Sequence, residues 1–113
     1  MNRWYIYLDD CREFNPEKSK EYIWSCYVHG LSTPLIVRNY NSMIDILNEL
    51  REHGGEVILD LDHDLGTKKN GYDLCKWIVE ENYPVIAFHI HSMNPVGRHN
   101  IRALLTHYGY DEF

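Results

Sequence analysis

The stretch VILDLDHD at residues 57–64 decides the fold. Its first part is almost continuously apolar, as expected for a central strand of a parallel sheet that is covered on both faces. Polar residues follow it directly, so we predict a strand over 57–61 with polar side chains at its carboxyl end. Asp60 departs from this pattern, and the sequence leaves open whether its carboxylate is buried and paired or displaced outward by a bulge.

Other short apolar runs follow the same plan, and each is followed by a stretch with helical spacing. The remaining predicted strands are 4–8, 35–37 and 85–90. The predicted helices begin at Asn15-Pro16, at Asn41 or Ser42, after Gly71 and at Asn94-Pro95. An Asn-Pro pair supplies a capping residue and then a proline at the first helical position. Four strand–helix units predict an α/β fold with an open, doubly wound parallel sheet and helices on both faces.

Length and composition are those of one ordinary globular domain. The chain has 113 residues, of which 44% are hydrophobic and 25% charged, so we expect a single domain over 1–113. No apolar run approaches the roughly 20 residues that a membrane helix needs, and residues 1–10 do not form a signal peptide. We therefore expect a cytoplasmic protein with no membrane association.

Charge and cysteine content exclude further classes. The net charge of −6 argues against a protein that clamps duplex DNA, since such binding needs many lysines and arginines. The 3 cysteines lack zinc-finger or CxxC spacing, so we expect reduced thiols. The sequence does not indicate an oligomeric state.

Polar residues gather where the predicted strands end, which is where open parallel sheets bind ligands. They are Asp9, Asp10, Asp62, His63, Asp64, His91 and Ser92. If the first and third strands are neighbours, the carboxylates of Asp9, Asp10 and Asp62 meet, and Mg²⁺ or Mn²⁺ would relieve their repulsion. The alternative is that each acidic pair is a solvated turn.

Histidines supply the second element of this predicted site. His91 lies near the tip of the fourth strand and is a candidate general acid or base, because imidazole titrates near neutral pH. His89 lies on the same face of that strand and is interpreted as a hydrogen-bonded core residue or a supporting partner. His63 could be a metal ligand, a proton shuttle or a loop residue.

An anion site is the third element. The helix that begins at Asn94-Pro95 has Gly97 in its first turn, and we expect this glycine to leave backbone N–H groups free for a phosphate. Arg98 lies one turn into the helix, and Arg12 could supply a second donor. The alternative is that Asn94 only caps the helix and Arg98 is only a surface charge.

Three strings carry a family resemblance. LDDCR at 8–12, LDHDLG at 61–66 and HSMNPVGR at 91–98 resemble, in order, motifs of the cyclic-phosphate processing receiver-like domains, which derive from response-regulator receivers. The resemblance spans essentially the whole chain. It implies a receiver-like or flavodoxin-like three-layer sandwich with four parallel strands in the order 2-1-3-4, and a role in handling cyclic phosphates, including RNA ends.

The resemblance also assigns residues. Asp9 and Asp10 are similar to the metal-binding acidic pair of receivers, Asp62 to their phosphoacceptor aspartate, and Ser92 to the Ser or Thr after the fourth strand. The chain departs from receivers because the sequence ends after the fourth helix, so the fifth strand with its lysine is not expected. This departure argues against phosphorelay.

These observations together predict a metal-dependent phosphoesterase that acts on a 2′,3′-cyclic nucleotide, a cyclic-phosphate RNA end or a small cyclic nucleotide. The predicted metal ligands are Asp9, Asp10 and Asp62. The predicted catalytic residues are His91, Asp62, His63 and Asp64. The predicted substrate-binding residues are Arg12, Ser92, Asn94 and Arg98. Two other classes remain open, namely a receiver phosphorylated at Asp62 and a module that binds a cyclic nucleotide without cleaving it.

Overall fold

The computed structural model describes residues 2–113 and contains one parallel sheet. Its strands are β1 (Arg3–Leu8), β2 (Thr33–Val37), β3 (Glu56–Leu61) and β4 (Ala87–Ile90). Its helices are α1 (Lys20–His29), α2 (Tyr40–Glu52), α3 (Gly71–Glu80) and α4 (Pro95–His107). The strand order is β2-β1-β3-β4 and every pairing is parallel, which confirms the predicted α/β sheet.

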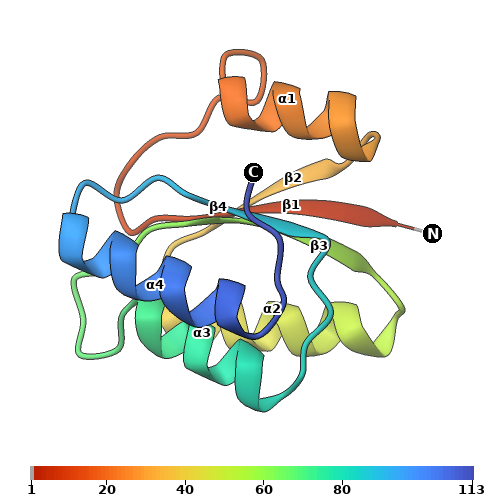
Figure 1. The fold of residues 1–113 in the computed structure, drawn as a ribbon. Coiled ribbons are helices and arrows are strands. Elements are labelled where there is room, and N and C mark those ends of the chain that lie inside the picture. Colours follow the sequence, from red (N-terminus) through yellow and green to blue (C-terminus); the bar gives the residue numbers. More distant parts are fainter. Residues whose placement is uncertain (1) are drawn as a thin grey trace.

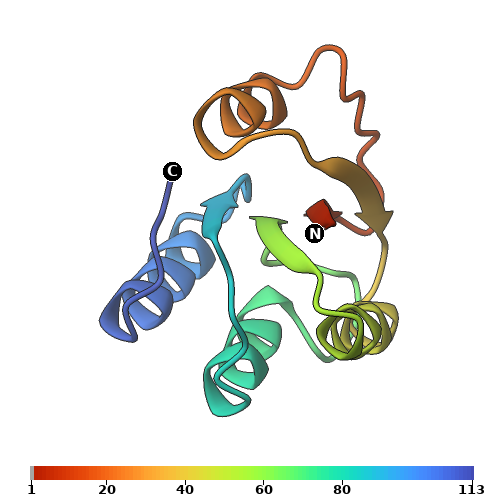
Figure 2. The ribbon, with the colours of Figure 1, turned by 90° about the vertical axis from the view of Figure 1, so that its right-hand side faces the viewer.

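The helices cover the two faces of the sheet unequally. Helix α1 lies alone on one face, and α2, α3 and α4 lie on the other (Figure 1). The end-on view in Figure 2 shows the same three layers. Among the described residues, no helix is long and apolar enough to cross a membrane.

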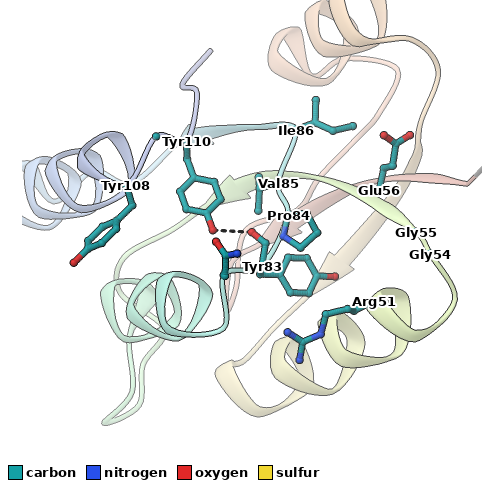
Figure 3. Close-up of a pocket in the computed structure, with 12 residues that line it drawn as sticks. Arg51, Gly54, Gly55, Glu56, Tyr83, Pro84, Val85, Ile86, Tyr108 and Tyr110 are labelled. Atoms are coloured by element: carbon teal, nitrogen blue, oxygen red, sulfur yellow. Dashed lines mark hydrogen bonds between the residues drawn. The ribbon is translucent and has the colours of Figure 1, made fainter.

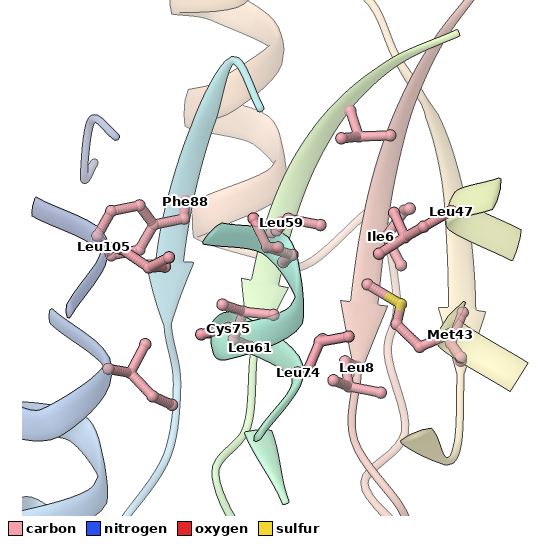
Figure 4. Close-up of a cluster of buried hydrophobic side chains, with 14 of the residues drawn as sticks. Ile6, Leu8, Met43, Leu47, Leu59, Leu61, Leu74, Cys75, Phe88 and Leu105 are labelled. Carbon is pink, nitrogen blue, oxygen red and sulfur yellow. The ribbon is translucent and has the colours of Figure 1, made fainter. Parts of the chain in front are cut away.

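The apolar core lies between the sheet and the three helices α2, α3 and α4. Alternate strand residues face this side, including Ile6 and Leu8 of β1 and Leu59 and Leu61 of β3 (Figure 4). These side chains are fully buried. They hold β1 and β3 side by side, and so place the carboxyl ends of the two central strands next to each other.

The sheet face under α1 is aromatic and polar instead. Tyr7, Asp60 and His89 form one row across β1, β3 and β4, because Tyr7 pairs with Asp60 and Asp60 pairs with His89. Asp60 is only 2% exposed. The open question about Asp60 is therefore answered: it lies in a regular strand, without a bulge, and its carboxylate is buried and paired.

Helix α1 begins later than expected. The prediction of a start at Asn15-Pro16 is wrong, because the Asn15 side chain accepts a hydrogen bond from the Glu17 N–H and its carbonyl accepts from Lys18 and Ser19, which makes a separate turn. Ser19 caps the helix instead, accepting from the Tyr22 N–H. The expected cap at Asn94 and proline at the start of α4 are confirmed.

The segment after α4 returns to the sheet. Phe88 donates its N–H to the carbonyl of Asp111 (2.8 Å), Phe113 donates to the carbonyl of Phe88 (2.9 Å), and Phe88 bridges Glu112 in parallel. Among the described residues the sheet keeps the four expected strands, and this segment adds only an isolated bridge beside β4. A short segment occupies the edge beside β4 and reaches toward the α1 face (Figure 2).

Truncation of the core should cost far more stability than truncation at the sheet edge. Leu59→Ala removes a fully buried side chain and should lower the free energy of unfolding by about 2–5 kcal/mol. Ile36→Ala on β2, whose side chain is 42% exposed, should cost less than about 1.5 kcal/mol. Urea unfolding followed by circular dichroism measures both. Equal losses in the two variants would contradict this assignment of the core.

Candidate functional site

The strand register builds a row of three side chains beyond the carboxyl ends of the strands. Leu8 pairs with Leu61, and Leu61 with Ile90, so the next residues in register are Asp9, Asp62 and His91. The ladder continues to this row, because the Asp62 N–H donates to the Leu8 carbonyl (3.0 Å) and the His91 N–H donates to the Leu61 carbonyl (2.9 Å). Sheet topology alone therefore brings the three side chains together.

His91 bridges two buried carboxylates. Its Nδ1 lies 2.6 Å from Asp60 Oδ1, and its Nε2 lies 2.9 Å from Asp9 Oδ2. Tyr7 stacks on the imidazole, with 4.4 Å between ring centres and 7° between ring planes. Both nitrogens face acceptors, so the ring is held as an imidazolium. Burial lowers the pKa of His91, but the hydrogen bond and charge of Asp60, with Asp9 and Asp62, outweigh burial and raise it above its usual value.

Asp60 anchors the outer side of this bridge. Its second oxygen accepts a hydrogen bond from the Tyr5 hydroxyl at 2.5 Å, so both oxygens are satisfied inside the protein. Sequence reasoning did not include Asp60 or Tyr5 among the site residues. The sequence feature that points to Asp60 is its position as a carboxylate inside an otherwise apolar strand.

Asp9 is the most strongly held carboxylate of the row. Its Oδ1 accepts hydrogen bonds from the N–H groups of Cys11 (3.0 Å) and Arg12 (2.8 Å). The Arg12 side chain approaches Oδ2 at 3.9 Å. Burial raises the pKa of Asp9, but the hydrogen bonds from Arg12, Cys11 and His91 outweigh burial and hold the pKa below its usual range. Asp9 is therefore ionised at neutral pH.

Asp62 forms no direct ion pair with the described residues. Its Oδ1 accepts from the His63 N–H at 2.8 Å. Burial and the charge of Asp9 raise its pKa, while His91, the His63 N–H and Ser92 offset part of the rise. The negative charge at this end of the row is the least compensated.

The row has a donor set that fits a divalent cation. Asp9, Asp62 and His91 each offer a ligand atom, and these atoms lie within 4.8 Å of one another. Asp10 belongs to a different group, with Asp9 and Cys11, and its side chain is exposed. The predicted set of Asp9, Asp10 and Asp62 is therefore not gathered as one group, because successive residues point to opposite sides of an extended chain. His91 is the third member of this group, but as an imidazolium between Asp60 and Asp9 it offers the row a proton donor rather than a metal ligand.

A second cluster joins the loop after β3 to the start of α4. His63 Nδ1 lies 2.9 Å from Asp64 Oδ1, and Asn94 Nδ2 donates to Asp64 Oδ2 at 3.4 Å. The His63 ring also packs on Gly97, where an added Cβ would lie 2.3 Å from the ring. Gly97 donates its N–H to Asn94 Oδ1 at 3.0 Å. The expectation that Gly97 leaves this turn open to an anion is therefore wrong, because His63 and Asn94 already occupy it.

The other predicted substrate-binding residues lie at different depths. Arg12 is at the rim, where Nη1 donates to the His91 carbonyl at 3.4 Å. Ser92 is buried and accepts a hydrogen bond from the Asn94 N–H. Arg98 is exposed, and its side chain forms no hydrogen bond or ion pair with the described residues.

A cavity of about 560 Å³ lies at the opposite end of the sheet (Figure 3). Its principal polar side chains already have partners: Arg51 binds Glu81, the Tyr83 hydroxyl donates to the Leu47 carbonyl, and the Tyr110 hydroxyl donates to the Tyr83 carbonyl. Side chains that are already paired leave little to recognise a polar ligand. The row at the carboxyl ends is therefore the better candidate site.

Comparison with known proteins gives one match. The family model described as "Cyclic-phosphate processing Receiver domain" matches residues 4–107. No curated protein and no solved structure matches the chain.

The His91 bridge should make stability depend on pH. Because the folded-state pKa is above the unfolded value of about 6.5, its contribution is fully present below about pH 6.5 and is lost as the pH rises through the folded-state pKa. We expect the free energy of unfolding of the wild type to fall in that window, and that of His91→Gln to fall less. Urea titrations with chelator measure this difference. His99→Gln, an exposed histidine of α4, is the control and should follow the wild type; parallel profiles for His91→Gln and wild type would contradict the bridge.

Proposed function

The chain belongs to the family of cyclic-phosphate processing receiver domains, and from this premise we propose that it is a metal-dependent phosphoesterase that hydrolyses cyclic phosphates. The proposed substrates are 2′,3′-cyclic nucleotides, RNA ends that carry a cyclic phosphate, or small cyclic nucleotides. The observation that carries the proposal is the row of Asp9, Asp62 and His91, in which the least compensated carboxylate lies beside an oriented imidazole.

Asp9 and Asp62 would hold the cation, either Mg²⁺ or Mn²⁺. Two carboxylates plus water molecules suit both ions. A bound cation would polarise a phosphoryl oxygen and lower the pKa of a water molecule. The charge of Asp62, which forms no direct ion pair with the described residues, is the feature that such an ion would satisfy.

His91 would act as the general acid. Asp60 holds Nδ1 and Tyr7 lies flat on the ring, so Nε2 is the nitrogen that faces the row. In hydrolysis, the water oxygen forms a new bond to phosphorus and releases one proton to solvent, while the bond to one ribose oxygen breaks and Nε2–H donates its proton to that oxygen. His91 then takes up a proton from solvent, so the net reaction consumes one water molecule. The products are a phosphate monoester and a free hydroxyl group.

The remaining residues would bind and orient. Arg12 at the rim could pair with a phosphate oxygen, and Arg98 has a free guanidinium on the same edge of the sheet. Ser92 and Asn94 support the turn that follows His91. His63 and Asp64 form a hydrogen-bonded pair that would orient the attacking water.

A binding module without turnover is the second candidate. It is favoured by one observation, namely that both His91 nitrogens face carboxylates, so that the proton donor is engaged before any ligand arrives. Recovery of chemically intact ligand after prolonged incubation with metal would support this function over hydrolysis.

Loss of the acid should reduce turnover. We expect purified protein with Mn²⁺ or Mg²⁺ to open nucleoside 2′,3′-cyclic phosphates, and His91→Ala to lower kcat by roughly 10² to 10⁴, since general acid catalysis contributes that range. Asp45→Asn, an exposed residue of α2, is the control and should keep wild-type kcat. Product identification by chromatography and ³¹P NMR is the measurement. Undiminished turnover in His91→Ala would exclude His91 as the acid.

Metal should stabilise the protein through Asp62. Ligands that bind only the folded state raise its stability by mass action, so Mn²⁺ or Mg²⁺ should raise Tm in the wild type. Asp62→Asn should reduce this rise, and it should stabilise the metal-free protein because it removes repulsion from Asp9. His91→Ala should keep most of the metal response. Thermal unfolding with metal and with chelator tests this, and an equal response in Asp62→Asn and wild type would remove Asp62 from the site.

A further inference from the structure

We propose that a cavity of about 320 Å³ beside His91 is a binding site for a nucleobase with an amino group, and that the substrate is therefore a nucleoside cyclic phosphate. This inference rests on the proposed function and names its substrate class. The sheet side of the cavity consists of Tyr7, Asp60 and His91, and the segment that leads into α1 contributes Glu13, Phe14 and Lys18 among others.

The cavity shares a wall with the candidate site. His91 has Asp9 on its Nε2 side, and both His91 and Asp60 also line the cavity. A ligand whose phosphate lies near Asp9 and Asp62 would extend past the imidazole into this space. The volume is at the lower end of small-molecule pockets, about 300 to 1,000 Å³, which suits one nucleoside and excludes a large ligand.

The Tyr7 hydroxyl is an unused polar group in this wall. Tyr7 is only 8% exposed, yet its hydroxyl forms no hydrogen bond with the described residues. The hydroxyl is therefore not engaged within the protein and is available to a ligand in the cavity. A tyrosine hydroxyl is protonated at neutral pH, so this group can donate a hydrogen bond to a ring nitrogen or carbonyl oxygen of a base.

The charge of the cavity selects the kind of base. Glu13 forms no ion pair with the described residues, and Glu21, which also lines the cavity, only approaches His89 at 3.8 Å. Lys18 and the His91 imidazolium are the basic side chains in the lining, against the three carboxylates of Glu13, Glu21 and Asp60. The net charge of the lining is therefore negative, and the glutamate carboxylates can accept hydrogen bonds from amino groups.

Guanine fits this lining better than uracil does. Its ring N–H and amino group lie side by side and match the two oxygens of a carboxylate, and its carbonyl oxygen can accept from the Tyr7 hydroxyl. Uracil has one ring N–H between two carbonyl oxygens, which a carboxylate repels. Phe14 adds an apolar surface against which a base can pack.

The test compares substrates with and without the base. We would measure kcat/KM for guanosine 2′,3′-cyclic phosphate, uridine 2′,3′-cyclic phosphate and ethylene glycol cyclic phosphate, which has no base. The wild type should prefer guanosine over uridine by about tenfold or more. In the double variant Glu13→Gln/Glu21→Gln, and separately in Tyr7→Phe, the ratio of guanosine to base-free activity should fall about tenfold through KM. Glu17→Gln, an exposed residue of the same segment outside the cavity lining, is the matched control.

A second arm separates this inference from the proposed function. Binding of guanosine itself, measured by NMR with chelator present, needs no turnover. Guanosine binding that the double variant weakens supports the cavity even if no cyclic phosphate is cleaved. If all the substrates are cleaved with equal efficiency, and both variants cleave them as the wild type does, the proposed base site is wrong. The proposed phosphoesterase function is then still supported. If the protein neither binds guanosine nor cleaves a cyclic phosphate, both the proposed base site and the proposed function are wrong. We would also measure kcat/KM for a short RNA that ends in a guanosine 2′,3′-cyclic phosphate. Comparison with the mononucleotide shows whether an RNA end or a free nucleotide is the preferred substrate.

Discussion

The structure depends on the hydrogen-bonded bridge from Asp60 through His91 to Asp9. A carboxylate such as Asp60 in the middle of a sheet is strongly destabilising unless its charge is paired and its oxygens are hydrogen-bonded. His91 and Tyr5 supply both requirements. Because these residues come from β1, β3 and the end of β4, the bridge joins the strands on the α1 face while the apolar core joins them on the other. The same contact that satisfies a buried charge therefore orients the imidazole.

The order of the strands and the location of the site could be predicted from sequence because both follow from local patterns and from the family motifs. An apolar run that ends in acidic residues identifies a buried strand and its carboxyl edge, as 57–64 does. The pairing of Asp60 with His91 could not be predicted, because it depends on the register between β3 and β4, which no local pattern encodes. The row of Asp9, Asp62 and His91 arises from that same register.

Two wrong predictions share a physical cause. Asn15-Pro16 and Gly97 were interpreted from residue type alone, and in both places a neighbouring side chain decides the outcome. Ser19 competes with Asn15 for the helix start and caps α1, since the Asn15 side chain already closes a turn. Gly97 has the open space that its small size implies, but the His63 ring fills it. Small residues indicate room for a close approach, and only the fold decides which group approaches.

The two carboxylates that His91 bridges, Asp60 and Asp9, differ in the other hydrogen bonds that they accept. On the Nδ1 side, Asp60 is bound to Tyr5 and buried under α1, so this bond of 2.6 Å is an anchor. On the Nε2 side, Asp9 also has two backbone N–H groups, and it stays satisfied if the imidazole turns away from it. A proton donor needs this asymmetry, because one nitrogen must hold the ring in place while the other exchanges its partner for the substrate. The arrangement thus explains how a histidine that is fully engaged in the unliganded protein can serve the proposed reaction without a rearrangement of the sheet.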